Sequence, residues 1–175
     1  SARKSASSPS KVTRKQVMQQ KTSTTSRADD TTSTGTARLV SFATQLQGRD
    51  VPAKVMHAAK RHLIDTCGAI VGGMQMDVAR KIARVPGVAM QCAGGLPVPG
   101  SPLTLDAPSF AMLCGTAAHG IELDDGYREG SCHPGVTVIP ATLAAATTHA
   151  ASGRDLLHAL IVGYEAVAAI SAAAH

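Results

Sequence analysis

The segment VPAKVMHAAKRHLIDTCGAIVGG, residues 51–73, decides the expected fold of this chain. Pro52 stands where the first turn of a helix accepts a proline, because the missing N–H is not needed there. Gly72 and Gly73 supply a stop signal at the other end. The segment therefore predicts one long helix.

Helices are also expected on both sides of this segment. Residues 37–46 place their apolar side chains on one stripe, with Thr36 as a plausible N-cap. Asp77 can cap a short helix over residues 77–85, which ends before Pro86. Helix follows helix with no strand pattern between them.

Residues 87–106 interrupt this series. Their sequence, GVAMQCAGGLPVPGSPLTLD, is full of Gly and Pro and predicts a loop or a short irregular hairpin.

Three further helices are expected after this interruption. The first begins at Ala107 or Pro108 and stops around a run of acids. The second begins near Pro134, and Pro140 inside it predicts a kink or a late start. Ser152 caps the third, which is still apolar at His175, so we expect partner surface or further chain to cover it.

The composition favours an all-α body over residues 37–175. Hydrophobic residues make up 44% of the chain, enough for a core, but aromatics only 2%, with no Trp. The core must therefore come from Ala, Val, Leu, Ile and Met, which suit closely packed helices. We expect a multi-helix domain.

The net charge of +5 belongs to residues 1–36. That segment has seven basic and two acidic residues, whereas the body has ten of each. The pI of 9.3 therefore gives no support for a nucleic-acid groove in the body. The segment is rich in Ser and Thr and poor in apolar residues, which predicts a disordered basic tail. As an alternative, its scarcity of acids resembles a transit peptide for the mitochondrial matrix.

The cysteines favour a reducing compartment. Cys67, Cys92, Cys114 and Cys132 are widely spaced and form no CxxC pair, as expected for free thiols. No apolar run approaches the roughly 20 residues of a membrane span. We expect a cytoplasmic protein with no membrane partner.

The charged residues of the body gather in HGIELDDGYREGSCHPG, residues 119–135. On a continued helix His119, Glu122 and Asp125 share one face, whereas Asp124 points elsewhere. Negative charge at a helix C-terminus is unfavourable by about 0.3–1 kcal/mol per group. A local rule broken without a stabilising gain indicates a functional site.

Three interpretations of this segment stay open on the residues alone. The acids could form a solvated turn that keeps an apolar body soluble. His119, Glu122 and His133 could bind a divalent metal, although the specific zinc and iron motifs are absent. His133 could carry out general acid–base chemistry, with a carboxylate orienting it.

Other chemistry is weaker. Cys132 beside His133 has no third partner for a nucleophilic site. Asp65 is expected to make structural hydrogen bonds. The remaining helical histidines are expected at the surface or as satisfied interior groups: His57, His62, His149 and His158.

Three stretches of the sequence resemble the MmgE/PrpD family, which includes 2-methylcitrate dehydratases, cis-aconitate decarboxylases and iminodisuccinate epimerases. They are residues 51–73, residues 106–146 around AAHGIELDD and HPG, and residues 152–170. The resemblance implies a helical N-terminal domain of a longer, usually homodimeric enzyme. Such enzymes act on small di- or tricarboxylates without a metal or organic cofactor.

In decarboxylase members the site uses an aspartate, a threonine four residues later and the histidine of an HP motif. His133 matches the histidine, but Glu122 stands at the aspartate position and Gly126 at the threonine position, with one extra residue before the histidine. The exact reaction is therefore not carried over. The resemblance implies catalytic roles for His133, Glu122 and Asp125, and substrate binding by His119, Asp124, Tyr127 and Arg128.

The expected function is that of a lyase or isomerase that removes a proton next to a carboxylate. Dehydration, decarboxylation and epimerisation all begin in this way. A second, lid-like domain is expected to complete the site, so the 175 residues alone should be inactive. The competing interpretation is a non-catalytic helical module for interaction or oligomerisation.

Overall fold

The computed structural model describes residues 34–46 and 50–174. The predicted disordered tail therefore lies almost wholly outside the described residues. The described elements are α1 (Gly35–Leu46), α2 (Ala53–Gly73), α3 (Asp77–Ile82), β1 (Gln91–Pro97), β2 (Thr104–Leu105), α4 (Ala107–His119), the 3-10 turn η1 (Arg128–Gly130), α5 (Pro134–Thr148) and α6 (Gly153–Ala174).

The mostly helical fold is confirmed, and so is the alternative of a short hairpin over residues 87–106. Strands β1 and β2 pair antiparallel, and the register shifts between Gln91 and Leu96. Among the described residues this is the one sheet. The body is thus helical with a two-stranded addition rather than strictly all-α.

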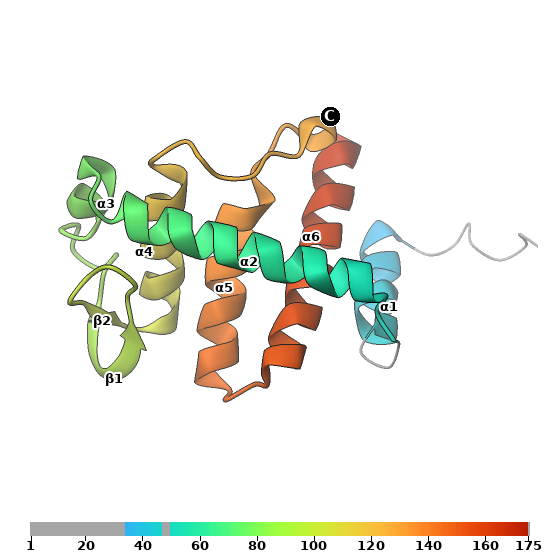
Figure 1. Ribbon diagram of the computed structural model, residues 1–175, viewed down its shortest axis with the longest axis horizontal. Helices are drawn as coiled ribbons and strands as arrows, with labels where there is room; N and C mark the ends of the chain where they lie inside the picture. Colours follow the sequence, from blue (N-terminus) through green and yellow to red (C-terminus); the bar gives the residue numbers. More distant parts are fainter. Residues whose placement is uncertain (1–33, 47–49, 175) are drawn as a thin grey trace, which may run out of the picture. The chain divides into compact units, whose positions relative to one another are not determined.

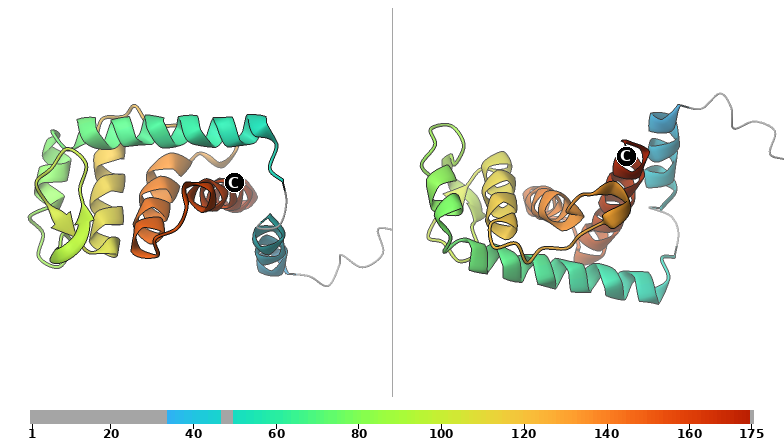
Figure 2. Two further views of the ribbon diagram at one scale, coloured as in Figure 1. Left: turned by 60° about the horizontal axis from the view of Figure 1, so that its bottom comes forward. Right: turned by 90° about the horizontal axis from the view of Figure 1, so that it is seen from above.

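Helix α2 crosses α4, α5 and α6 on one side of the body (Figures 1 and 2), and it contacts all three. These three helices stand side by side, with α4 against α5 and α5 against α6. The connection from α4 to α5 runs past the C-terminal half of α6, which η1 contacts. This connection is the acidic segment singled out above.

Glycines permit the closest helix contacts. A Cβ atom on Gly73 would lie 1.7 Å from the carbonyl oxygen of Ala117, so α2 and α4 touch backbone to backbone there. Helix α5 begins at Pro134 and continues through Pro140, so the late start was wrong. Proline leaves the carbonyl four residues earlier without its helical partner. That carbonyl, of Val136, lies against Gly115 of α4, where a Cβ would approach it to 2.6 Å.

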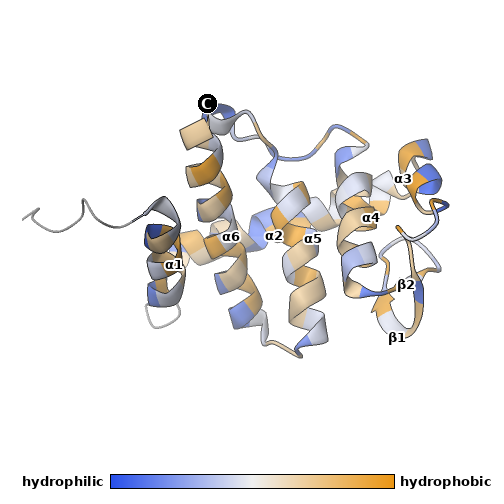
Figure 3. Cartoon of the chain, turned by 180° about the vertical axis from the view of Figure 1, so that it is seen from behind, coloured by the Kyte–Doolittle hydropathy of each residue, from blue (hydrophilic) through white to orange (hydrophobic). Residues whose placement is uncertain are grey.

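Two apolar clusters form the core. The first joins α2, α4 and the hairpin around Ile70, Leu105 and Leu113, and the second joins α5 and α6 around Ile139 and Leu160. Figure 3 shows how much of α5 and α6 is apolar.

Helix α6 corrects the expectation that no apolar segment is long enough to cross a membrane. An 18-residue window of this 22-residue helix has a mean hydropathy of 1.7, so the helix is long and apolar enough by length and composition. Core helices pass the same test, and Leu157, Leu160 and Ile161 of α6 are buried in the second cluster. The length of α6 therefore does not establish a membrane span.

The starts of α6 and α3 test two expected helix caps. Ser152 and Asp155 cap α6 reciprocally: Asp155 N–H donates to Ser152 Oγ (3.2 Å), and Ser152 N–H donates to the Asp155 carboxylate (3.3 Å). The cap on Ser152 is confirmed. The expected cap on α3 is wrong by one residue, because Met76 is the N-cap and Asp77 opens the helix.

The N-cap of α4 gives the first testable prediction. Ser109 N–H donates to Asp106 Oδ1 (2.9 Å). The hydrogen bond of the Ser109 side chain first, and this backbone bond after it, lower the pKa of Asp106 from its ordinary 3.8. A depressed pKa contributes stability at neutral pH that is lost as pH falls through the folded value. We expect Asp106→Ala to lower the denaturation midpoint at pH 7, and the difference from the parent to vanish in acid. Urea unfolding followed by circular dichroism at both pH values tests this, and Asp50→Ala is the exposed control.

Candidate active site

Helix α4 ends at His119, whereas a shared face of His119, Glu122 and Asp125 requires a helix that continues to Asp125. Gly120 closes the helix, and Glu122 follows with a left-handed backbone, φ 53°. The Glu122 side chain is 78% exposed, and its carboxylate lies 4.0 Å from His119 Nε2. The predicted shared helical face is therefore wrong, and Glu122 lies at the solvent-exposed edge of the region around His119.

Asp124, expected to point elsewhere, joins the two histidines. Its side chain is 1% exposed, and Oδ2 lies 2.9 Å from His119 Nδ1 and 3.1 Å from His133 Nδ1. The two imidazole rings have centroids 5.0 Å apart. The other oxygen, Oδ1, is buried without a hydrogen-bond partner among the described residues. We call His119, Asp124 and His133 the imidazole–carboxylate cluster.

His133 occupies the N-cap position of α5. Its Nδ1 lies 2.8 Å from the backbone carbonyl of Asp125, which can only accept a hydrogen bond. The proton of a neutral His133 is therefore held on Nδ1, and Nε2 keeps its lone pair. An imidazole in this tautomer, with a 44% exposed side chain, can accept a proton from a bound molecule.

Asp125 supports the site through its own side chain. Oδ1 accepts from Gly135 N–H at the start of α5 (2.8 Å), and Oδ2 accepts from the Tyr164 hydroxyl of α6 (2.8 Å). Burial and the Asp125 carboxylate both raise the pKa of Tyr164. A Cβ on Gly135 would lie within 3 Å of Asp125, Thr66 and Tyr164. Asp125 therefore anchors the connection between α4 and α5 to the start of α5 and to α6.

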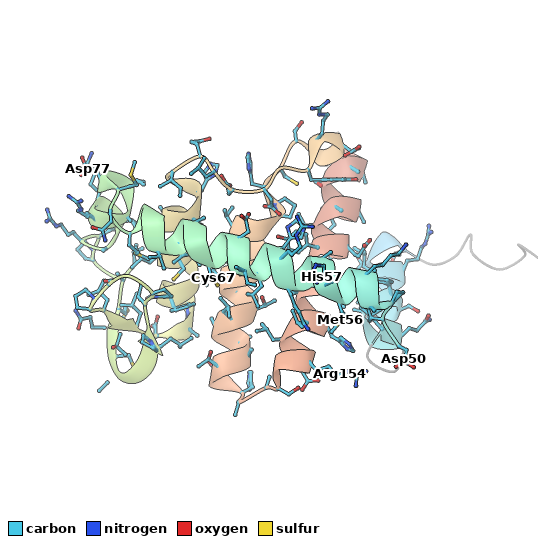
Figure 4. The ribbon with its side chains drawn as sticks, viewed as in Figure 1. Asp50, Met56, His57, Cys67, Asp77 and Arg154 are labelled. Carbon is cyan, nitrogen blue, oxygen red and sulfur yellow. The ribbon has the colours of Figure 1, made fainter. Side chains whose placement is uncertain are left out.

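His62 belongs to this region, although the sequence pattern gave it no role. Its Nδ1 lies 3.4 Å from Asp125 Oδ2, and its ring lies 5.1 Å from that of Tyr164. His57, by contrast, lies exposed on α2 as expected (Figure 4).

A pocket of about 260 Å³ adjoins Asp125. Its lining comes from α2, the connection, α5 and α6, namely His62, Asp125, Gly126, Tyr127, Pro134, Tyr164, Glu165 and Ala168. A second pocket of about 290 Å³ shares His62 and adds Arg61 and Asp65. Asp65 is exposed on this wall. Arg61 is therefore a cation beside the site that sequence reasoning missed.

The remaining candidates lie on the turn around η1. Tyr127 and Cys132 exchange two backbone hydrogen bonds, of 2.8 and 3.2 Å. The Cys132 thiol donates to Ser171 Oγ (3.4 Å). Arg128 is exposed and makes no ion pair with a described residue. Gly126 has open space where a Cβ would lie, so the threonine position of the decarboxylase pattern is unfilled here.

The imidazole–carboxylate cluster also has the residue types of a metal site, and its ligand atoms lie within 4.8 Å of one another. Both Nδ1 atoms, however, already face a hydrogen-bond acceptor. A metal ion held by both Nδ1 atoms would have to displace these bonds, whereas ligation through Nε2 would leave them in place.

A comparison with protein families decides the relationship. The MmgE/PrpD N-terminal domain matches residues 37–175. The chain belongs to the MmgE/PrpD family. The resemblance noted on residues 51–73, 106–146 and 152–170 is thereby confirmed for the N-terminal portion of the family's proteins.

Curated relatives come from two Aspergillus species. The chain is 30% identical over 139 residues to a protein of Aspergillus oryzae named "Cis-aconitate decarboxylase-like protein oryM", covering 74% of this chain and 28% of the relative. It is 28% identical over 144 residues to a "Cis-aconitate decarboxylase" of Aspergillus terreus, covering 79% and 29%. The chain thus spans less than a third of these relatives. The search found no matching solved structure.

Proposed function

We propose that these residues form one wall of the active site of a cofactor-independent lyase or isomerase that acts on small di- or tricarboxylates. The observation that carries the proposal is His133, whose Nδ1 is fixed by the Asp125 carbonyl at 2.8 Å. Its Nε2 is then the base that removes a proton from a carbon next to a substrate carboxylate. Dehydration, decarboxylation and epimerisation all follow from that first step.

Cationic groups near the pockets suit such substrates. Arg61 and His62 line adjoining pockets, and a guanidinium can bind a carboxylate with two hydrogen bonds. In the proposal His119 at the end of α4, together with Tyr127 and Arg128 on the connection, adds hydrogen-bond donors. Glu122, exposed and 4.0 Å from His119, adjusts the charge at the rim.

The site is incomplete within these residues. Both pockets are open to solvent, and the chain spans 28% and 29% of the two relatives compared. A reaction that needs several substrate carboxylates bound and water excluded requires a second wall. We therefore propose that the 175-residue chain is inactive alone and acts within a longer, homodimeric, cytoplasmic protein.

The test is an assay with cis-aconitate, 2-methylcitrate and iminodisuccinate. It is run on the 175-residue chain and on the longest protein that its reading frame encodes. We expect turnover of one substrate by the longer protein and none by the chain. No turnover by the longer protein overturns the proposed function. Turnover by the chain that His133→Ala abolishes overturns the claim of an incomplete site.

Exposed apolar side chains favour a second candidate, a non-catalytic interaction module. Ile64 is 72% exposed, Leu123 75% and Ile170 58%. Such a module would self-associate in light scattering and would not bind tricarboxylates in a calorimetric titration. Binding of a tricarboxylate with loss of affinity in Arg61→Ala supports the enzyme instead.

A further inference from the structure

The buried position of Asp124 needs an explanation beyond the presence of a base. The side chain is 1% exposed, whereas those of His119 and His133 are 48% and 44% exposed. Burying a carboxylate costs free energy unless hydrogen bonds or charges compensate it. Asp124 Oδ2 lies within hydrogen-bond distance of Nδ1 of both imidazoles, and Oδ1 has no hydrogen-bond partner among the described residues. The compensation therefore comes from the two rings.

The acceptors around the rings decide where the protons lie. His119 Nδ1 faces only the carboxylate of Asp124, and His133 Nδ1 faces that carboxylate and the Asp125 carbonyl. Neither acceptor can donate a hydrogen bond. Both Nδ1 atoms therefore carry hydrogen, and each ring keeps its Nε2 for a bound molecule.

The two rings differ in their other surroundings. His119 Nε2 lies 4.0 Å from the Glu122 carboxylate, so negative groups face this ring at both nitrogens. The hydrogen bond that His119 donates to Asp124 is the largest influence that raises the pKa of His119, and the charges of Asp124 and Glu122 raise it further, against partial desolvation. His133 Nδ1, in contrast, shares its bond with a neutral carbonyl. Carboxylates therefore face His119 at both ring nitrogens, whereas His133 has a carboxylate and a neutral carbonyl at Nδ1.

We propose that Asp124 is a positioning residue that directs the Nδ1–H groups of His119 and His133 at one carboxylate oxygen, so that His119 donates a proton from Nε2 and His133 accepts one. This assignment rests on the proposed function and extends it. It makes His119 a second catalytic residue, with a role opposite to that of His133.

The roles account for every proton in an elimination of water. His133 Nε2 takes the proton from the carbon next to the carboxylate, and that C–H electron pair forms the new double bond. The C–O bond to the β-hydroxyl breaks with its electrons on oxygen. His119 Nε2–H supplies the proton that completes the departing water. His133 is then protonated and His119 neutral, and exchange with solvent restores both.

The test is ¹⁵N NMR of the imidazoles in the 175-residue chain, because long-range spectra distinguish the nitrogen that carries hydrogen. We expect the neutral form of both rings to carry hydrogen on Nδ1. In Asp124→Asn, which keeps the shape and removes the charge, we expect the titration midpoint of His119 to fall. Asp50→Asn removes an exposed carboxylate at the start of α2 and should leave that midpoint unchanged.

Three results would overturn the assignment. These are a neutral ring with hydrogen on Nε2 in the parent, an unchanged His119 midpoint in a folded Asp124→Asn, or zinc bound stoichiometrically with both Nδ1 atoms unprotonated. If Asp124→Asn does not fold, the parent spectrum still decides. None of these spectra requires turnover. The assignment can therefore fail while the lyase activity is observed, and the lyase activity can be absent while the assignment holds.

Discussion

Gly73→Ala is expected to cost about 3 kcal/mol or more of the free energy of unfolding, a large share of the roughly 5–15 kcal/mol that holds a domain folded. The added Cβ would lie 1.7 Å from the carbonyl oxygen of Ala117 and 2.4 Å from its carbonyl carbon. Both atoms belong to the backbone of α4, so no side chain can rotate away. Relief requires α2 and α4 to separate, which opens the core around Ile70 and Leu113.

Gly68→Ala is the matched control on the same helix. A Cβ at Gly68 meets nothing within 4 Å. Alanine is the better helix former, so this variant should gain about 0.5–1 kcal/mol. Urea unfolding followed by circular dichroism measures both. Equal and small effects at the two positions would contradict the close approach of α2 and α4.

The second large effect is expected from His133→Ala. Loss of a general base lowers turnover by roughly 10²–10⁴-fold. The imidazole makes no capping hydrogen bond to α5, so the substitution should change the stability of the helix little. The loss of turnover then reports the loss of the base. The measurement is kcat/KM of the longer protein with whichever carboxylate it turns over.

His149→Ala provides the control for this variant. His149 is an exposed histidine at the other end of the same helix, where it forms the C-cap. It should leave kcat/KM within about twofold of the parent, as surface substitutions usually do. A His133→Ala protein that folds and keeps more than a tenth of the parent activity would remove His133 from the mechanism.

The helices could be predicted because their signals are local. Pro52, the glycine pair at 72 and 73, and Ser152 each act within one or two turns of a helix end. The hairpin was predictable only as an alternative, because its pairing depends on a register shift between Gln91 and Leu96.

The residue types of the candidate site could be read from the sequence, but their arrangement could not. The helical spacing predicted that Asp125 lies on the same face as His119. Because α4 ends at His119, Asp124 is the carboxylate that bonds His119, and Asp125 accepts from the Tyr164 hydroxyl instead. That exchange depends on α6, 39 residues further along the chain. The place of His62 was missed for the same reason, because its contact with Asp125 depends on how the connection folds back against α2.

The anchoring of the connection to α6 has a consequence for the order of synthesis. The bonds that hold it, from Tyr164 to Asp125 and from Cys132 to Ser171, both join residues 39 positions apart. A nascent chain that has released α4 and α5 from the ribosome has every residue of the imidazole–carboxylate cluster but not the helix that holds the connection. The two bonds that hold the connection against α6 can therefore form only after translation has passed residue 171.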